Sequence, residues 1–318
     1  MTPGTGARLR HLARRLLRMR QPHLALARRL GRPLPDRLYL ALGHLAYFGR
    51  WPDYDRPRTL NEHIQAYMLR GRSPGLRVAA DKLATRELVR RIGGEALLVP
   101  LLGVWSRAQD VPLETLPRPC VLKGSAGSGQ VIFLRPDRRE DPAQLRLTLQ
   151  RWLDTDYSLV SREWCYRGVP RRILAEALLA DPAAADPLSP EAIPADHKLY
   201  VIGGRVRFIQ VDRGRFGRHT RNLYDTGWRL LPHRLTLPNH PADPRPRRLA
   251  EMIDLAERLA EGYEFLRVDA YLLPAPDHPQ GERLLIGELT NYPGAGFERF
   301  IPTAYAHELG AHWPAPPG

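Results

Sequence analysis

The chain has 318 residues, 43% of them apolar, and carries 48 lysines and arginines against 34 aspartates and glutamates, a net charge of +14. Its length supports a large core in two or three closely packed subdomains, and its composition excludes an intrinsically disordered protein. We expect no signal peptide, membrane span or disulfide framework, and therefore a cytoplasmic protein whose positive charge suits an anionic partner.

Residues 1–50 hold eleven of the arginines and a single acid, Asp36. Between Arg8 and Arg20, leucines recur at helical spacing with arginines over the remaining surface: Leu9, Leu12, Leu16 and Leu17. Such a basic amphipathic helix either lies on an anionic membrane surface or packs on its own domain with a solvated basic face. Nucleic-acid binding is not expected, because no recognised binding motif accompanies the charge.

The first structural signals after this region are two helix starts. Thr59 and Glu62 form a capping-box pattern that opens an amphipathic helix reaching Leu69. A second helix begins near Asp81 and Lys82 and stops at the glycine pair 93–94. A lysine at a helix N-terminus opposes the macrodipole, so an anion is expected beside Lys82.

Lysine itself is rare, occurring only as Lys82, Lys123 and Lys198. Arginine supplies the other positive charges, so a lysine that remains is expected where a compact ammonium with rotatable donors is needed. Lys123 opens a glycine-rich loop, 124–129, enclosed by two apolar runs. This pattern predicts a strand, a sharp turn and a returning strand, either as an anion-binding loop or as an ordinary hairpin. It is not a Walker loop, in which lysine follows the glycines.

The middle of the chain alternates strands and helices. Residues 99–104 predict a strand, 142–153 a helix, and 171–179 a buried strand whose single acid, Glu176, must be paired or bind a ligand. Residues 196–202 and 205–212 predict a hairpin about a glycine pair. A loop is expected next, and its arginines either hold carboxylates or phosphates or are solvated: Arg213, Arg215, Arg218 and Arg221.

The C-terminal third predicts a helix over 246–262 and two strands, 265–273 and 283–290. Asp269 and Glu288 are isolated acids within these strands, and Asn291 follows the second. Two carboxylates on neighbouring strands with an amide beside them indicate a Mg²⁺ site made only of oxygen ligands. The alternative is a structural salt bridge between Asp269 and Arg267.

The order of these motifs resembles the ATP-grasp ligases, and more narrowly the TupA-like ATP-grasp family of bacterial surface-polysaccharide and teichuronopeptide biosynthesis. The likeness spans roughly residues 33–313. The fragments that carry it are Pro57–Glu62, Asp81–Lys82, Pro100–Trp105, Val121–Gly124, Ser161–Trp164, Asp196–Lys198, Phe208–Asp212, Arg221–Asp225, Arg267–Asp269 and Gly287–Thr290. Thr290 stands where related ligases have an asparagine, and Ala177 where they often have lysine.

The resemblance implies an α+β (α/β) ATP-grasp fold, in which two α+β subdomains clasp ATP behind a helical N-terminal region. The expected divisions are a basic helical region at 1–56, the N-terminal part of the ligase at 57–118, the small subdomain with the glycine loop at 119–180, and the C-terminal subdomain with the metal site at 181–318. The cofactors implied are ATP and Mg²⁺.

The resemblance also assigns roles to individual residues. ATP binding is expected of Lys82, Lys123, Gly124, Ser125, Gly127, Ser128, Gly129, Glu176, Leu178 and Lys198. Lys123 and Arg267 are the expected catalytic residues, Asp269, Glu288 and Asn291 the metal ligands, and Asp212, Arg213 and Arg221 the substrate-binding residues.

The activity implied is ATP-dependent ligation of a carboxylate to an amine through an acyl phosphate, in the biosynthesis of a cell-surface polysaccharide. The substrates would be small molecules or glycans, such as a uronic acid or amino-acid carboxylate and an amino acid or other amine. The alternatives are a glycosyltransferase of polysaccharide biosynthesis and a glycan-assembly protein that binds nucleotide without catalysis.

Overall fold

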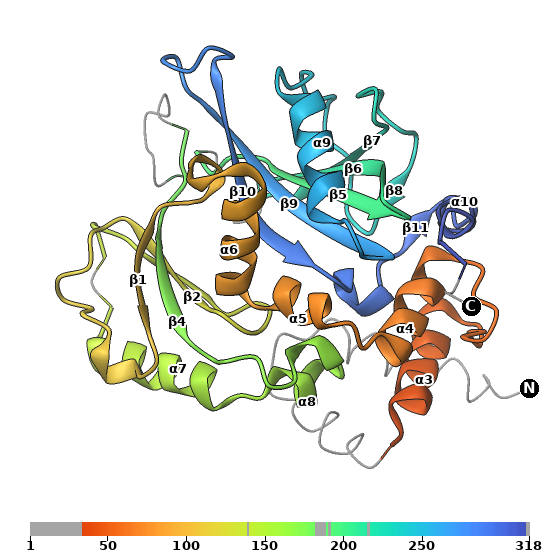
Figure 1. Ribbon diagram of the computed structural model, residues 1–318, viewed down its shortest axis with the longest axis horizontal. Helices are drawn as coiled ribbons and strands as arrows, with labels where there is room; N and C mark the ends of the chain where they lie inside the picture. The colour runs from red at the N-terminus through yellow and green to blue at the C-terminus, as the bar shows by residue number, and fades with distance from the viewer. Residues whose placement is uncertain (1–33, 139, 182–188, 190–191, 215–216, 316–318) are drawn as a thin grey trace, which may run out of the picture.

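The computed structural model describes residues 34–138, 140–181, 189, 192–214 and 217–315. The helix expected between Arg8 and Arg20 lies outside these residues. In the part of the chain that is described, two sheets form the framework, and α5 (Pro74–Ala80) and α6 (Lys82–Gly93) lie between them (Figure 1). None of the described helices is long and apolar enough to cross a bilayer.

The smaller sheet has four strands in the order β1-β4-β2-β3. They are β1 (Leu101–Trp105), β2 (Cys120–Gly124), β3 (Val131–Leu134) and β4 (Ile173–Ala177), and each neighbouring pair is antiparallel. The hairpin predicted about the glycine loop is therefore confirmed as β2 and β3. The helix α7 (Pro142–Asp154) packs Leu145, Leu149 and Leu153 onto this sheet.

The larger sheet has five strands in the order β10-β9-β5-β6-β7. They are β5 (Asp196–Ile202), β6 (Arg205–Arg213), β7 (Thr220–Tyr224), β9 (Phe265–Pro274) and β10 (Glu282–Thr290). One face is covered by α9 (Leu249–Leu259), which contributes Met252, Leu255 and Leu259 to an apolar core. Burying each such side chain stabilises the fold by about 1.5–3 kcal/mol, which fixes this face as the inner one.

The helices that precede β1 in the chain include α5 and α6, which lie between the smaller and the larger sheet (Figure 1). The capping box predicted at Thr59 and Glu62 is present at the start of α4 (Leu60–Arg70), which follows α3 (Asp36–Phe48). Asp81 caps α6 by accepting from the Leu83 amide. The amide of Lys82, the first residue of α6, donates to the Ser125 carbonyl across 3.1 Å. This hydrogen bond places the start of α6 beside the glycine loop.

A short connection links α7 back to the small sheet. It contains α8 (Tyr157–Ser161) and the 3-10 turn η3 (Trp164–Tyr166). Arg77 of α5 places its guanidinium 4.4 Å from the centre of the Trp164 ring. This cation–π contact holds the connection against the helices that join the two sheets.

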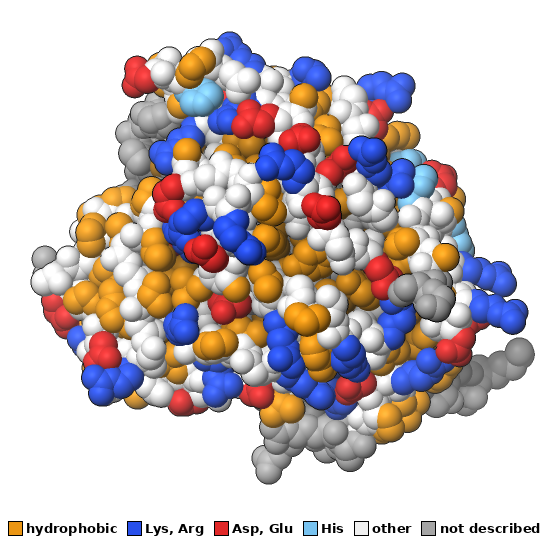
Figure 2. All heavy atoms as spheres, in the orientation of Figure 1, with side chains coloured by type: hydrophobic (Ala, Val, Ile, Leu, Met, Phe, Trp, Pro, Cys, Tyr) orange, Lys and Arg blue, Asp and Glu red, His pale blue; other side chains and the backbone are white. Residues whose placement is uncertain are grey.

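The structure differs from the predictions made from the sequence in two respects. Arg221 was expected in a loop but lies buried in the edge strand β7, paired opposite Asp212 of β6. A two-stranded sheet of β8 (Arg234–Leu235) and β11 (Phe300–Ile301) was not expected, and it precedes the last described helix, α10 (Ala304–Gly310). On the face seen in Figure 2, basic and acidic side chains are interspersed.

Candidate nucleotide and metal site

The site is built on the face of the larger sheet that α9 does not cover. Alternation along the strands puts charged and polar side chains of all five strands on this face. They are Glu288 and Thr290, Arg267 and Asp269, Asp196, Lys198 and Tyr200, Gln210 and Asp212, and Arg221. In this row, Glu288 lies opposite Asp269 and Asp196 lies opposite Asp212, and lysine or arginine side chains compensate these carboxylates.

Asp269 occupies the centre of the row. Lys198 lies directly opposite on β5 and donates to one carboxylate oxygen across 2.8 Å, while Arg267 donates to both oxygens at 2.6 and 2.7 Å. Lys198 also binds Asp196 on its own strand. Burial alone would raise the pKa of Asp269, but the two cations offset it and hold that pKa below its ordinary value.

Glu288 reaches the same face through a β-bulge. The register of β10 against β9 shifts between Ile286 and Glu288, so Glu288 rather than Gly287 lies opposite Asp269. A Cβ at Gly287 would come within 2.5 Å of the Tyr271 ring, which explains the glycine there. The bulge therefore places Asp269 and Glu288, the two acids predicted from the sequence to bind the metal, opposite each other.

Lys82 faces Glu288 from the start of α6. Its ammonium lies 3.4 Å from the Glu288 carboxylate and donates to the Gly127 carbonyl across 3.0 Å. The anion expected beside this helix start is thus supplied in part by Glu288. Burial alone would raise the pKa of Glu288, and the Lys82 ammonium is the main influence that holds it below its ordinary value.

Lys123 projects from the small sheet toward Glu176 on the neighbouring strand β4, and the two groups are 2.6 Å apart. Arg86 of α6 donates to the other oxygen of Glu176 across 2.9 Å. The buried acid in the predicted strand is therefore paired, as its burial requires. Leu178 follows directly after β4 and is half-buried.

The glycine loop has an anchored base and an exposed tip. Ser125 is fully buried, and its hydroxyl is hydrogen-bonded to the Pro170 carbonyl and the Arg172 amide, both at 2.9 Å. Gly127 and Gly129 have φ values of 141° and 75°, which L side chains rarely adopt. Ser128 and Gly129 at the tip are exposed, so their amides are the ones accessible to phosphate oxygens.

The donor set fits Mg²⁺ in its chemistry. Asp269 and Glu288 supply two facing carboxylates, and Mg²⁺ commonly takes one or two carboxylates and completes its shell with phosphate oxygens and water. Thr290 lies on the same face and accepts from Arg267 across 3.0 Å. Asn291 lies past the end of β10 and donates to the Leu76 carbonyl across 2.8 Å, so its role as a third ligand stays a prediction.

The three residues predicted to bind substrate separate into two groups. Asp212 and Arg221 form a buried bidentate pair at 2.6 and 3.0 Å, and Arg221 also donates to Glu298 across 3.0 Å. Burial alone would raise the pKa of Asp212, but hydrogen bonds from His219 and Arg221, together with the Arg221 charge, lower it. Arg213, at the end of β6, instead pairs with Asp243 and is half-exposed.

Three further residues belong to this region and were not predicted. Arg86 lies four residues after Lys82 on the same helical face, which was the available signal. Tyr157 lies against the glycine loop, because a Cβ at Gly127 would come within 3.1 Å of its ring. Burial raises the pKa of Glu163 to about 8, and repulsion from the Glu288 carboxylate adds to the rise.

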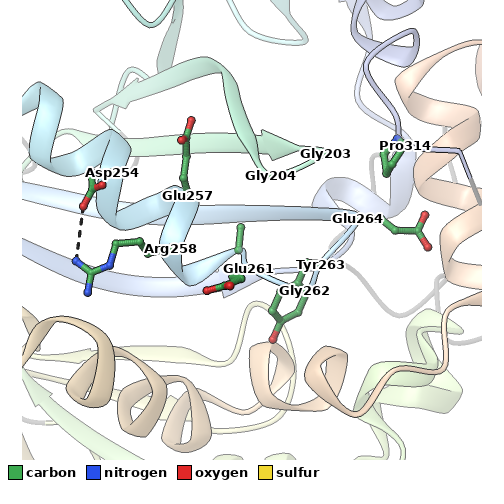
Figure 3. Close-up of a pocket in the computed structure, with 11 residues that line it drawn as sticks. Gly203, Gly204, Asp254, Glu257, Arg258, Glu261, Gly262, Tyr263, Glu264 and Pro314 are labelled. Atoms are coloured by element: carbon green, nitrogen blue, oxygen red, sulfur yellow. Dashed lines mark ion pairs between the residues drawn. The ribbon is translucent and has the colours of Figure 1, made fainter. Parts of the chain in front are cut away.

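A hollow of about 630 Å³ lies elsewhere, beside the β5–β6 turn and the end of α9 (Figure 3). Acidic side chains line it, including Asp254, Glu257, Glu261 and Glu264. Several are already compensated: Glu264 binds Arg70, and Glu257 binds Arg205. None of the predicted site residues lines this hollow, so it is distinct from the candidate site.

The two sheets, the glycine loop and the row of lysines and carboxylates together define an ATP-grasp protein. The model of the TupA-like ATP-grasp family matches residues 62–313, which is most of the chain, and the protein belongs to this family. No curated protein matches the sequence.

Several solved structures are similar at low identity. An L-amino acid ligase from Bacillus licheniformis is 14% identical, with 74% of this chain and 49% of that chain covered and a TM-score of 0.42. A D-alanine–D-alanine ligase from Bacillus anthracis is 14% identical over 74% of this chain and 64% of that one, with a TM-score of 0.42. The ATP-grasp ligase PsnB, complexed with a precursor variant, Mg and ADP, is 14% identical over 80% of this chain and 67% of that one, with a TM-score of 0.40. The chain thus spans about half the length of the L-amino acid ligase.

Proposed function

We propose that the protein is an ATP-dependent ligase that joins a carboxylate to an amine through an acyl phosphate. The observation that carries this proposal is the assembly of all three lysines, the glycine loop and two facing carboxylates at one junction of an ATP-grasp protein. Phosphoryl transfer needs chiefly positioning and charge neutralisation, which these groups supply without a nucleophilic serine or cysteine.

In this proposal the cations exchange their present partners for phosphate oxygens. Lys123 and Lys82 would leave Glu176 and Glu288 to bind the phosphates, with the amides of the glycine-loop tip covering them. Mg²⁺, held by Asp269 and Glu288 when bound, would neutralise charge on the β- and γ-phosphates. Arg267 and Lys198, beside Asp269, would steady the oxygens of the transferred phosphoryl group.

The proposed reaction has two steps. A carboxylate oxygen of the substrate bonds to the γ-phosphorus while the bond from that phosphorus to ADP breaks. The amine nitrogen then bonds to the acyl carbon, and the bond from that carbon to the phosphate oxygen breaks. Of the two protons that the ammonium loses, one leaves on phosphate and one goes to solvent.

The proposed pathway rests on the resemblance to the TupA-like ATP-grasp family, which implies a role in surface-polysaccharide or teichuronopeptide biosynthesis. We propose that the carboxylate belongs to a uronic acid or an amino acid on a glycan or its precursor. The test measures ADP release with a panel of uronic acids and amino acids as both substrates, followed by mass spectrometry of the products. ATP-dependent formation of an amide supports the proposal, and nucleotide binding without any ADP release across the panel contradicts it.

We also propose that the basic segment before α3 brings the enzyme to an anionic membrane surface, where lipid-linked glycan precursors would be reached. Arginines would contact the headgroups, and Leu9, Leu12 and Leu16 would lie at their boundary. The test is sedimentation with vesicles of anionic phospholipid, compared with vesicles of neutral phospholipid. Binding that is unchanged after deletion of residues 1–20 would contradict this role.

A further inference from the structure

Glu176 on β4 is bound by two cations that come from different elements of the fold. One oxygen of its carboxylate accepts from Lys123 of β2 across 2.6 Å, and the other accepts from Arg86 of α6 across 2.9 Å. The side chains of Glu176 and Arg86 are only 6% and 8% exposed, whereas that of Lys123 is 20% exposed. One cation is enough to neutralise a buried carboxylate, so the second cation at Glu176 needs a reason.

The guanidinium of Arg86 has donors that the present arrangement does not use. Its Nη1 binds Glu176, and no other acceptor among the described residues binds this guanidinium. Its Nε is enclosed and has no partner in this part of the chain. An enclosed donor without an acceptor is costly, whereas an arginine can bind both oxygens of one carboxylate as a fork. Arg86 therefore lacks hydrogen bonds while Lys123 occupies the second oxygen of Glu176.

The position of α6 connects this triad of Lys123, Glu176 and Arg86 to the proposed phosphate site. Lys82 lies one turn before Arg86 on the same helix, and its ammonium donates to the Gly127 carbonyl of the glycine loop across 3.0 Å. The helix that provides Arg86 thus also contacts the loop that would cover the phosphates.

Charge decides what happens to Glu176 when Lys123 moves to a phosphate. If Lys123 were its only cation, the move would leave a buried carboxylate unpaired, which is strongly unfavourable. With Arg86 present, Glu176 keeps one ion pair, and the repulsion between two cations that share one acid is relieved. The second cation therefore allows Lys123 to leave Glu176 at a low cost in free energy.

We propose that Arg86 is a positioning residue for ATP, which keeps Glu176 compensated while Lys123 moves from this acid to the phosphates. This inference rests on the proposed function, in which Lys123 makes that exchange. In the nucleotide-bound state Nη2 of Arg86 takes the oxygen that Lys123 releases, and Arg86 itself does not touch the nucleotide.

The test measures the Kd for MgATP by calorimetry, which does not require ligation, together with the Tm of each variant. Wild type, Arg86→Gln, Glu176→Gln and the double variant form a double-mutant cycle. Arg86→Lys keeps the charge and tests its contribution. Arg90→Gln is the matched control, because Arg90 lies one turn later on α6, is exposed, and is paired with the glutamates Glu87 and Glu95.

We expect Arg86→Gln to raise the Kd for MgATP at least about tenfold, because Lys123 can then bind phosphate only by leaving Glu176 unpaired. Arg86→Lys should recover part of this affinity, and Arg90→Gln should stay within about twofold of wild type. The Glu176→Gln background has no carboxylate to compensate. Adding Arg86→Gln there should change the Kd by less than about twofold.

Two results would overturn the inference. A purely structural role of Arg86 would lower the Tm of Arg86→Gln and leave its Kd for MgATP close to that of wild type. Direct contact of Arg86 with the nucleotide would weaken binding equally with and without Glu176. If Arg86→Gln does not fold, Glu176→Gln and the double variant decide: equal Kd values support the inference, and clearly weaker binding by the double variant overturns it.

Failure of the proposed ligation gives a different result. A wild type that binds MgATP but forms no amide contradicts the ligation, and the Kd of Arg86→Gln still decides the role of Arg86. A wild type that binds no MgATP overturns the role of Arg86 as well.

Discussion

At the scale of single residues, the site is a set of charges that satisfy one another. Asp269 is the clearest case, since it neutralises two buried cations, Arg267 and Lys198. Removing a carboxylate from such a cluster leaves buried charge unpaired, which costs about 3–5 kcal/mol. Substitutions at Asp269 therefore report on stability as well as on catalysis, whereas Glu288 is more exposed and has a single close partner.

We expect Glu288→Gln to lower turnover at least a hundredfold and to shift the Tm by only a few degrees, because the variant loses a charge facing Lys82 and the metal position. Asp269→Asn should lower turnover as strongly and also reduce the Tm distinctly. ADP release and thermal denaturation, measured on both variants, check this. Turnover of Glu288→Gln within a few-fold of wild type would show that this acid is structural.

Lysine identity gives a second prediction at this scale. Lys123→Arg should reduce turnover on the order of a hundredfold, because a planar guanidinium misplaces the reacting groups. Lys82→Arg should be milder. Lys198→Arg should also lower stability, since Lys198 is fully enclosed between Asp196 and Asp269. The control is Arg107→Lys, because Arg107 is exposed. Near-normal ADP release by all three lysine variants would refute the role of the lysines in the nucleotide site.

At the scale of elements, the bulge in β10 decides which way Glu288 points. Side chains alternate along a strand, so without the extra residue Glu288 would lie on the face covered by α9. Gly287 and Gly103 are matched positions: each lies at a shift of strand register, and at each a Cβ would come within 2.5 Å of an aromatic ring.

Gly287→Ala and Gly103→Ala should therefore destabilise the fold to a similar extent, by about 1–3 kcal/mol. Turnover should fall at least tenfold only in Gly287→Ala, because only that strand carries Glu288. Urea denaturation and ADP release on the pair measure both effects. Equal losses of turnover in the two variants would mean that the bulge does not position the site.

Several helix starts and turns around the site can be predicted from short stretches of the sequence. The capping box at Thr59, the start of α6 at Asp81 and the hairpin about the glycine loop follow from short-range patterns, and the structure confirms them. Arg221 was misplaced because three nearby arginines and a glycine suggested a loop, while its pairing with Asp212 is fixed by the sheet.

At the scale of the whole molecule, one buried and one partly buried histidine couple stability to pH. Burial is the main cause that lowers the pKa of both His63 and His197 to about 4. Their unfolded pKa is about 6.5, so the unfolded chain binds more protons between these values. Their contribution to stability is complete above pH 6.5 and is lost as the pH falls toward 4.

The free energy of unfolding should therefore decrease between pH 7 and pH 5, with His197, the more deeply buried of the two, contributing up to about 3 kcal/mol over the full range. His197→Gln should flatten this dependence even if it lowers the Tm at pH 7. His307→Gln, on the exposed face of α10, is the control and should leave the slope unchanged. An acid dependence identical in His197→Gln and wild type would exclude this histidine as its source.

Because the chain has only three lysines, it offers few side-chain amines to reagents that modify amines. All three lysine ammoniums of the protein lie in the candidate site, with side chains only 6–20% exposed, so an amine-directed acylating reagent meets few targets besides the terminal amine. Limited acylation followed by peptide mapping would thus act as a footprint of the nucleotide site without any engineered label. MgATP should slow modification of Lys82 and Lys123 together, and protection of neither would place the nucleotide elsewhere.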